Sequence, residues 1–301
     1  MEIYNDCDQS GHFRWHSSGS PQASGQSSPA GHSRLESVII TYKDHPAFVL
    51  NRKALPKLLC PSEVKEQELK RLGIDRVDML DFTRELAETS ALDFLEQILI
   101  PRWHPKIIVV GHDSHFGRQR EGNRTFLERY ATRFNYRVEY VEPQLIEEQP
   151  ISSSMIRDFL GAGMIEEANR LLGRNYRLSG KVGTGIARGR EFGFPTANLI
   201  LSNPHQLIPA QGIYLSRAHL EHASFFGLTN IGKSPTVKHT GIVEIETFLI
   251  DFSGDIYGDK IQVELLRYLR EEKMFANTDE LIAAMHRDLA RASSLIPELQ
   301  A

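Results

Sequence analysis

The pattern of strands and helices changes near residue 173, so a single fold class cannot describe the whole chain. Before this point, apolar β-branched runs at 38–40 and 106–111 alternate with helical segments such as 123–134. This alternation predicts a parallel sheet with helices on both of its faces. After it, short apolar strands are separated by Gly, Pro and Asn, which is typical of a β-barrel or sandwich. We therefore expect an α/β domain followed by an all-β domain.

The length agrees with this division, because 301 residues correspond to two domains of about 150 residues each. Residues 10–33 contain eight Ser and four Gly but no Val, Ile or Leu, so they cannot build a core. The first strand that we expect begins at Val38. The expected segments are a disordered or frameshifted segment at 1–36, an α/β domain at 37–160, a linker helix at 161–172 and a barrel domain at 173–301.

Composition limits the partners that the chain can have. With 41% hydrophobic and 25% charged residues it is an ordinary globular protein. A net charge of -4 gives no reason to expect binding to nucleic acid. No apolar run approaches the roughly 20 residues of a membrane span, and the N-terminus lacks the apolar stretch of a signal peptide. The two cysteines, Cys7 and Cys60, do not have the spacing of a zinc site. We expect a cytoplasmic protein with small-molecule substrates and without nucleic-acid or membrane partners.

The segment 180–198 combines glycines with cationic side chains. It holds five glycines and three Lys or Arg residues in nineteen positions. Glycines let backbone N–H groups approach phosphate oxygens, and the cations supply the charge that an acidic protein otherwise lacks. The same composition also suits a solvent-exposed hairpin with glycines in its turns. Composition alone leaves both interpretations open.

The residues that follow favour the phosphate interpretation. Thr196 and Asn198 are two residues apart in an extended segment, so their side chains project to the same face. A hydroxyl and an amide oxygen on one face can share a cluster of metal ion and phosphate. The sequence therefore predicts a metal–nucleotide site at this point.

In these residues the C-terminal half resembles the riboflavin kinase family, whose Pro-Thr-Ala-Asn motif is found at 195–198. The resemblance extends through 209–214, 230–236, 246–252 and 269–275. It implies an antiparallel β-barrel, ATP and riboflavin as substrates, and Mg²⁺ held with ATP by Thr196 and Asn198. It also implies a nucleotide-covering flap, to which we assign Gly180, Lys181, Gly185, Arg188, Gly189 and Gly193.

By the same resemblance, Glu246 is the base that takes the proton from the terminal ribityl hydroxyl of riboflavin. Glu246 lies in an expected strand at 243–250, with Glu244 projecting to the same side. Glu244 is therefore the rival for this role. The resemblance places Arg270 in a segment on the flavin side, and an ordinary surface charge is the alternative for it.

Residues 37–160 resemble the adenylyltransferase half of the bifunctional bacterial flavin enzyme, which has a Rossmann-like nucleotidyltransferase fold. The matching segments are 41–46, 111–117 and 151–157. The resemblance implies that FMN and ATP are substrates and that Asp113 binds flavin. Ser152, Ser153 and Ser154 at a helix start, with Arg157 one turn on, form the expected phosphate site. A cluster of N-cap serines is the alternative.

The His-x-Gly-His signature of this nucleotidyltransferase family is absent from the chain. Residues 14–21 can be encoded by CGATGGCATTCATCTGGGTCACCA, and removal of the first base makes this string read Asp-Gly-Ile-His-Leu-Gly-His. We therefore hypothesise that residues 14–34 are an out-of-frame translation of the signature and of the helix after it. Without the two signature histidines, we expect the conversion of FMN to FAD to be impaired.

The sequence thus predicts a bifunctional flavin enzyme. The two resemblances imply that it phosphorylates riboflavin to FMN in the barrel and descends from enzymes that adenylylate FMN to FAD. Two alternatives are a riboflavin kinase alone and, in a different class, a non-catalytic flavin or nucleotide sensor. A sensor would not require a base such as Glu246.

Overall fold

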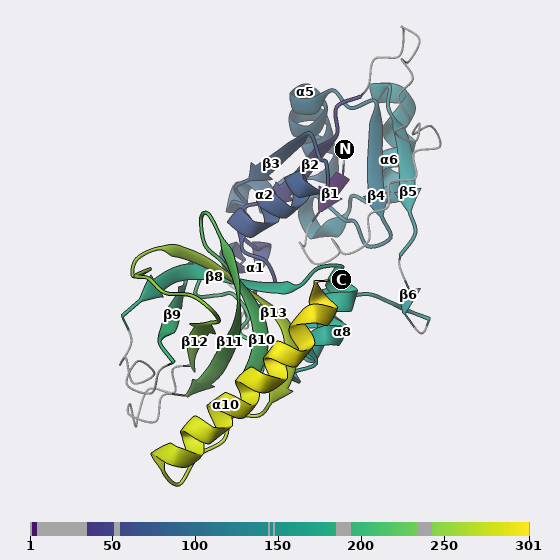
Figure 1. The fold of residues 1–301 in the computed structure, drawn as a ribbon. Coiled ribbons are helices and arrows are strands. Elements are labelled where there is room, and N and C mark those ends of the chain that lie inside the picture. The colour runs from purple at the N-terminus through teal and green to yellow at the C-terminus, as the bar shows by residue number, and fades with distance from the viewer. Residues whose placement is uncertain are drawn as a thin grey trace, which may run out of the picture. The chain divides into compact units, whose positions relative to one another are not determined.

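A computed structural model describes residues 2–4, 35–50, 55–143, 145–146, 148–184, 194–233 and 243–300. The chain forms two compact units (Figure 1). The first contains residues 1–56 and 60–151, and the second contains residues 57–59 and 152–301.

The first unit is built on a parallel sheet of five strands in the order β3-β2-β1-β4-β5. The strands are β1 (Glu2–Tyr4), β2 (Val38–Tyr42), β3 (Arg76–Leu80), β4 (Ile107–Gly111) and β5 (Arg137–Val141). Our expectation that the first strand begins at Val38 was wrong, because β1 precedes it and lies at the centre of the sheet (Figure 1). A run of three residues is too short for a periodicity to reveal it.

Short helices connect these strands. They are α1 (Pro46–Val49), α2 (Ser62–Arg71), α3 (Arg84–Glu88), α4 (Ala91–Asp93), η2 (Phe94–Leu99), α5 (Ile100–Trp103), η3 (Arg118–Arg120) and α6 (Arg124–Phe134). A two-stranded ribbon of β6 (Leu145–Ile146) and β7 (Gln149–Pro150) follows. The apolar spacing of residues 83–99 predicts a single helix. In the structure this helix is interrupted, because Thr89 is extended and the Ser90 hydroxyl accepts the Asp93 N–H, at 3.1 Å, to start a new helix.

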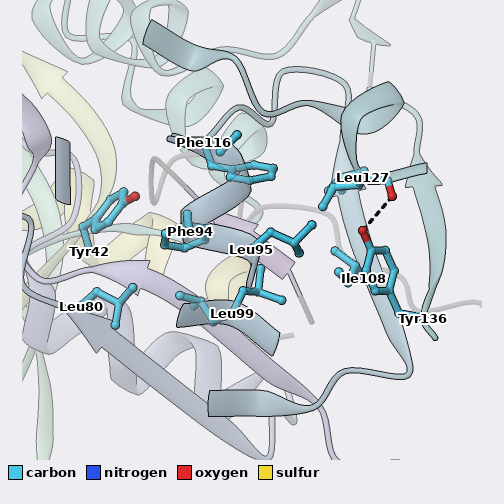
Figure 2. Close-up of a cluster of buried hydrophobic side chains, with 12 residues drawn as sticks. Tyr42, Leu80, Phe94, Leu95, Leu99, Ile108, Phe116, Leu127 and Tyr136 are labelled. Atoms are coloured by element: carbon cyan, nitrogen blue, oxygen red, sulfur yellow. Dashed lines mark hydrogen bonds between the residues drawn. The ribbon is translucent and has the colours of Figure 1, made fainter. Parts of the chain in front are cut away.

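The core of this unit lies between the sheet and these helices (Figure 2). Leu95 and Leu99 of η2 are fully buried with Ile108 of β4. The Tyr136 hydroxyl donates a hydrogen bond to the Leu127 carbonyl, at 2.7 Å, and burial raises the pKa of Tyr136 to about 12. The ring therefore contributes apolar area without leaving a buried hydroxyl unsatisfied.

The second unit is a closed antiparallel barrel, which confirms the expected fold of the C-terminal half. Its strands run in the order β10-β11-β12-β9-β8-β13. They are β8 (Tyr176–Gly183), β9 (Thr196–Leu201), β10 (Gly212–His219), β11 (Ser224–Lys233), β12 (Val243–Leu249) and β13 (Lys260–Arg270).

Helices accompany the barrel before and after its strands. They are α7 (Ser153–Gly161), α8 (Ile165–Leu172), α10 (Thr278–Leu295) and η4 (Ile296–Leu299). The sequence predicts a helix over 154–172 that is broken by the glycines at 161 and 163, and the break between α7 and α8 falls there. The compact units divide before α7, between residues 151 and 152, whereas the sequence suggested a domain boundary at residue 160.

The two faces of the barrel wall have different environments. On the inner face, the fully buried Thr229 hydroxyl is hydrogen-bonded to Ser216, at 2.8 Å, and to Thr247, at 2.9 Å. On the outer face, α10 packs over Leu215, Leu228 and neighbouring apolar residues. Figure 1 shows α10, in yellow, lying along the outside of the barrel. The helix therefore leaves only part of the outer face available for a ligand.

Candidate active site

Three polar residues lie side by side on neighbouring strands of the barrel. Glu246 of β12 is in register with Asn198 of β9 on one side and with Asn230 of β11 on the other. Residues that are paired across strands project to the same face of a sheet, so these three side chains share the outer face. We refer to Asn198, Glu246 and Asn230 as the polar row.

Thr196 belongs to the same face. It is two residues from Asn198 on β9 and in register with Phe248, which is two residues from Glu246 on β12. The hydroxyl and the amide that the sequence assigns to a metal–nucleotide site therefore lie next to the expected base. They meet because β9 pairs with β12, although about fifty residues separate them along the chain.

The surroundings of Glu246 disfavour its charged form. Burial has the largest effect and raises the pKa of Glu246, and the negative charges of Glu244 and Glu272 raise it further. A raised pKa makes the carboxylate a better proton acceptor once it is deprotonated. Glu244 is in register with Gly232, and hence lies two residue pairs beyond the polar row, on the same face.

An aromatic group borders the polar row on the side of Thr196. The Phe194 ring lies edge-on to Phe248, with centroids 5.0 Å apart, and edge-on to His286 of α10, at 5.2 Å. Phe194 is only 4% exposed. The strand that carries Thr196 is therefore held at its start by both β12 and α10.

Arg270, the expected flavin contact, is engaged with α10. Its Nε lies 2.9 Å from Asp288 Oδ1 and its Nη2 lies 2.6 Å from Asp288 Oδ2, a bidentate ion pair in which both side chains are largely buried. Nη1 donates to the carbonyl of Glu271, at 2.9 Å. In this structure the guanidinium thus holds the end of β13 and the residues after it against α10.

The flap residues fall into two groups. Gly180 and Lys181 belong to β8, where a β-carbon on Gly180 would overlap the backbone carbonyl of Ile200. Close packing of β8 on β9 therefore accounts for this glycine without a nucleotide. Lys181 is exposed and in register with Ile200. The other four, Gly185, Arg188, Gly189 and Gly193, lie outside the described residues.

The expected flavin contact lies at the end of a strand, and the expected phosphate site lies at the start of a helix. Asp113 follows the carboxyl end of β4, beside Ser114, whose hydroxyl accepts the Gly111 N–H at 3.0 Å. At the start of α7, the Ser152 hydroxyl accepts the Met155 N–H, so Ser152 is the N-cap, and Ser153 and Ser154 form the first turn. Arg157 Nε donates to the carbonyl of Lys57, at 2.8 Å.

The side-chain oxygens of Thr196, Asn198 and Glu246 are of the kinds that fit a metal ion shared with a nucleotide. Within the described ranges, no three His, Cys, Asp or Glu side chains gather in a way that could enclose a metal ion. A hydroxyl and an amide oxygen next to a carboxylate suit a cation that takes its other ligands from phosphates and water.

The described helices include none that is long and apolar enough to cross a bilayer.

Sequence reasoning did not single out Asn230, Gly232 or Glu272 as site residues. Asn230 and Gly232 fall in a matching segment, but their place beside Glu246 depends on strand register. The sequence feature that points to Glu272 is its position two residues after Arg270. No spacing in the sequence shows that these side chains lie beside β12.

Comparisons with known proteins find a matching family for each half of the chain. A family model described as riboflavin kinase matches residues 172–296, and one described as FAD synthetase matches residues 26–155. A bifunctional riboflavin kinase/FMN adenylyltransferase from Listeria monocytogenes is 34% identical over 86% of this chain and 82% of its own length. The Haemophilus influenzae protein of the same name is 33% identical over 86% and 84%. A crystal structure described as a macrolide-efflux protein from Streptococcus pneumoniae superimposes with a TM-score of 0.77 at 30% identity, covering 86% of this chain and 84% of that chain.

Proposed function

The chain belongs to the family of bifunctional riboflavin kinases/FMN adenylyltransferases, and we propose which of its residues perform the two reactions. The C-terminal barrel is the riboflavin kinase, which transfers the γ-phosphoryl group of ATP to riboflavin and yields FMN and ADP. The N-terminal α/β domain is of the FAD synthetase type, which joins FMN and ATP into FAD and pyrophosphate.

Glu246 is the general base of the kinase reaction. The terminal ribityl hydroxyl gives its proton to the Glu246 carboxylate while its oxygen attacks the γ-phosphorus, and ADP leaves with the electrons of the broken bond. The observation that carries this proposal is the register of Glu246 with Asn198, which puts the base one strand away from the nucleotide ligands. Glu244 lies two residues further along β12 from the pair with Asn198 and is a poorer candidate.

Thr196 and Asn198 hold the divalent ion, for which we propose Mg²⁺. When bound with ATP, Mg²⁺ neutralises charge on the phosphates during transfer. The role of the protein is to present the Thr196 hydroxyl and the Asn198 amide oxygen on one face of β9. Lys181 and the flap residues Gly180, Gly185, Arg188, Gly189 and Gly193 complete the proposed nucleotide site.

Replacement of Glu246 by Gln tests this assignment. We expect E246Q to lower the kcat for FMN formation by about 10²- to 10⁴-fold, the usual contribution of a general base, with little change in the binding of riboflavin. The matched control is E244Q, on the same strand and face, which we expect to lose less than threefold, about 0.7 kcal/mol. FMN and ADP are quantified by chromatography with saturating ATP.

Other outcomes have clear meanings. If E244Q loses activity and E246Q does not, the base is Glu244. If the unaltered chain binds flavin and forms no FMN, the non-catalytic sensor is the better description and the kinase assignment of this barrel is wrong.

For the N-terminal domain we propose that adenylyl transfer is impaired. Asp113 is the flavin contact, and Ser152, Ser153, Ser154 and Arg157 are the phosphate contacts, by resemblance to the family. The chain lacks the His-x-Gly-His signature that this family uses to stabilise the triphosphate. Both flanks of residues 14–34 supply sheet strands, β1 before and β2 after, which supports a local change of reading frame inside an otherwise intact domain.

A further inference from the structure

The Glu272 carboxylate lies over Gly232 on the outer face of the barrel. A β-carbon added to Gly232 would come within 2.6 Å of all three atoms of the Glu272 carboxyl group. Gly232 is two residues from Asn230 on β11, so Glu272 borders the polar row at that end. The missing side chain of Gly232 thus makes the space that this carboxylate occupies.

The segment that carries Glu272 is held in place by Arg270. The bidentate pair with Asp288 ties the end of β13 to α10, and Arg270 Nη1 holds the carbonyl of Glu271. Glu272 is exposed, as is Glu271. Glu272 lies over a glycine and its negative charge repels that of Glu246, and among the described residues its carboxylate has no hydrogen-bond or ion-pair partner.

The order of the strands would place the two substrates over different strands on the outer face of the barrel. β8 and β9 carry the proposed nucleotide and metal ligands, β12 carries the base, and β11 comes next. The acceptor alcohol must reach Glu246 from the side away from the triphosphate, because attack is in line with the leaving group. That side is β11, with Asn230 and Glu272.

Two acceptor oxygens, Asn230 Oδ1 and the Glu272 carboxylate, lie on this side. The Asn230 amide oxygen is buried and has no hydrogen-bond partner within the described part of the chain, and the Glu272 carboxylate only accepts when charged. A triphosphate would be repelled there. A chain of neutral hydroxyl groups supplies the donors that such acceptors need.

We propose that Glu272 is a binding residue for the acceptor substrate and accepts hydrogen bonds from ribityl hydroxyls of riboflavin, with Gly232 leaving the space and Arg270 holding the segment. This inference rests on the proposed kinase function. It assigns to Arg270 a positioning role through Glu272 and α10, in place of direct contact with the flavin.

The test compares substrates that differ only in the polyol. We expect E272A to raise the KM for riboflavin about tenfold, since a hydrogen bond to a charged group is lost, and to leave the KM for ATP unchanged. E272Q keeps an acceptor oxygen and should lie between E272A and the unaltered chain. Lumiflavin has the same ring system with a methyl group in place of the ribityl chain. Its inhibition constant against riboflavin phosphorylation should not change in either variant.

The substitution G232A should raise the KM for riboflavin by displacing the Glu272 carboxylate instead of removing it. Its β-carbon displaces only the end of the flexible Glu272 side chain, so the barrel should fold normally while the KM for riboflavin rises as in E272A. The controls are E271Q, on the exposed neighbour, and G161A, where an added β-carbon meets nothing within 4 Å. Neither should change the KM for riboflavin.

Two results would overturn the inference. One is an unchanged KM for riboflavin in E272A and G232A, and the other is an equal loss for riboflavin and lumiflavin, which would show an effect on the ring site or on the fold. Failure of the proposed function looks different, because the unaltered chain would then form no FMN.

Discussion

At the scale of single residues, Glu264 of β13 shows how the barrel tolerates a buried charge. It is 8% exposed, ion-paired with Arg177 of β8 and 3.2 Å from His219 Nε2 of β10. Burial alone would raise the pKa of Glu264, but hydrogen bonds from His219 and Arg177 outweigh this effect and lower the pKa to about 2. One carboxylate thus ties together three adjacent strands.

This pKa predicts a dependence of stability on acid. Because the folded-state pKa of Glu264 is depressed, its contribution is fully present above the unfolded pKa of about 4.3 and is lost as pH falls through about 2. We expect E264Q to be less stable at pH 7 by on the order of 3 kcal/mol, with the difference shrinking between about pH 4 and pH 2.

Urea unfolding followed by circular dichroism at several pH values measures this effect. The control is E221Q, since Glu221 is on the same unit with a side chain that is 87% exposed, and its substitution should leave stability unchanged. A constant difference between E264Q and the unaltered chain from pH 7 to pH 2 would show that the ionisation of Glu264 does not stabilise the fold.

At the scale of elements, α10 supports β9, the strand that carries the proposed metal ligands. Phe194 precedes β9 and contacts both Phe248 of β12 and His286 of α10. The helix begins at a capped N-terminus, where the Asn277 side chain accepts the Glu280 N–H at 2.9 Å. Its apolar face packs on the barrel, so the helix is a fixed support for the start of β9.

We therefore expect F194L to weaken the nucleotide site. Edge-to-face contacts are worth about 0.5 to 1.5 kcal/mol each, so the KM for ATP should rise by about three- to tenfold with a smaller change in kcat. The control is F252L, which removes a comparable pair, Phe225 and Phe252, with centroids 5.0 Å apart. An equal rise in both variants would indicate a general loosening of the barrel.

At the scale of the whole molecule, the two units differ in how complete their sites are. The proposed base, the proposed metal ligands and the proposed acceptor side of the barrel site all belong to one compact unit. The first unit keeps the central sheet, with β1 between β2 and β4, but the chain lacks the signature histidines of its family. The two activities should therefore differ in the same polypeptide.

We predict that the chain converts riboflavin to FMN and forms FAD poorly. A version in which residues 14–34 are recoded in the shifted frame should form both products, because the signature histidines are restored. Separate measurement of FMN and FAD for each version tests this, and robust FAD synthesis by the chain as it stands would contradict it. The nucleotide sequence across codons 14–34 shows directly whether the shift is possible.

Much of the local architecture follows from the sequence. The change in the pattern of strands and helices near residue 173 separates the two folds. The break between α7 and α8 falls at Gly161 and Gly163. The interruption after α3 was missed, because Thr89 and Ser90 do not break an apolar period. The strand β1 was missed because three residues carry too little pattern.

By itself, the sequence determined the two fold classes and the placement of Thr196 and Asn198 on one face of an extended segment, since these depend on neighbours within a few residues. Only the tertiary structure decided that Glu246 lies between Asn198 and Asn230, and that Glu272 fills the space over Gly232. Strand order and register in a closed barrel result from packing among residues far apart in the chain, and a local sequence pattern does not predict that packing.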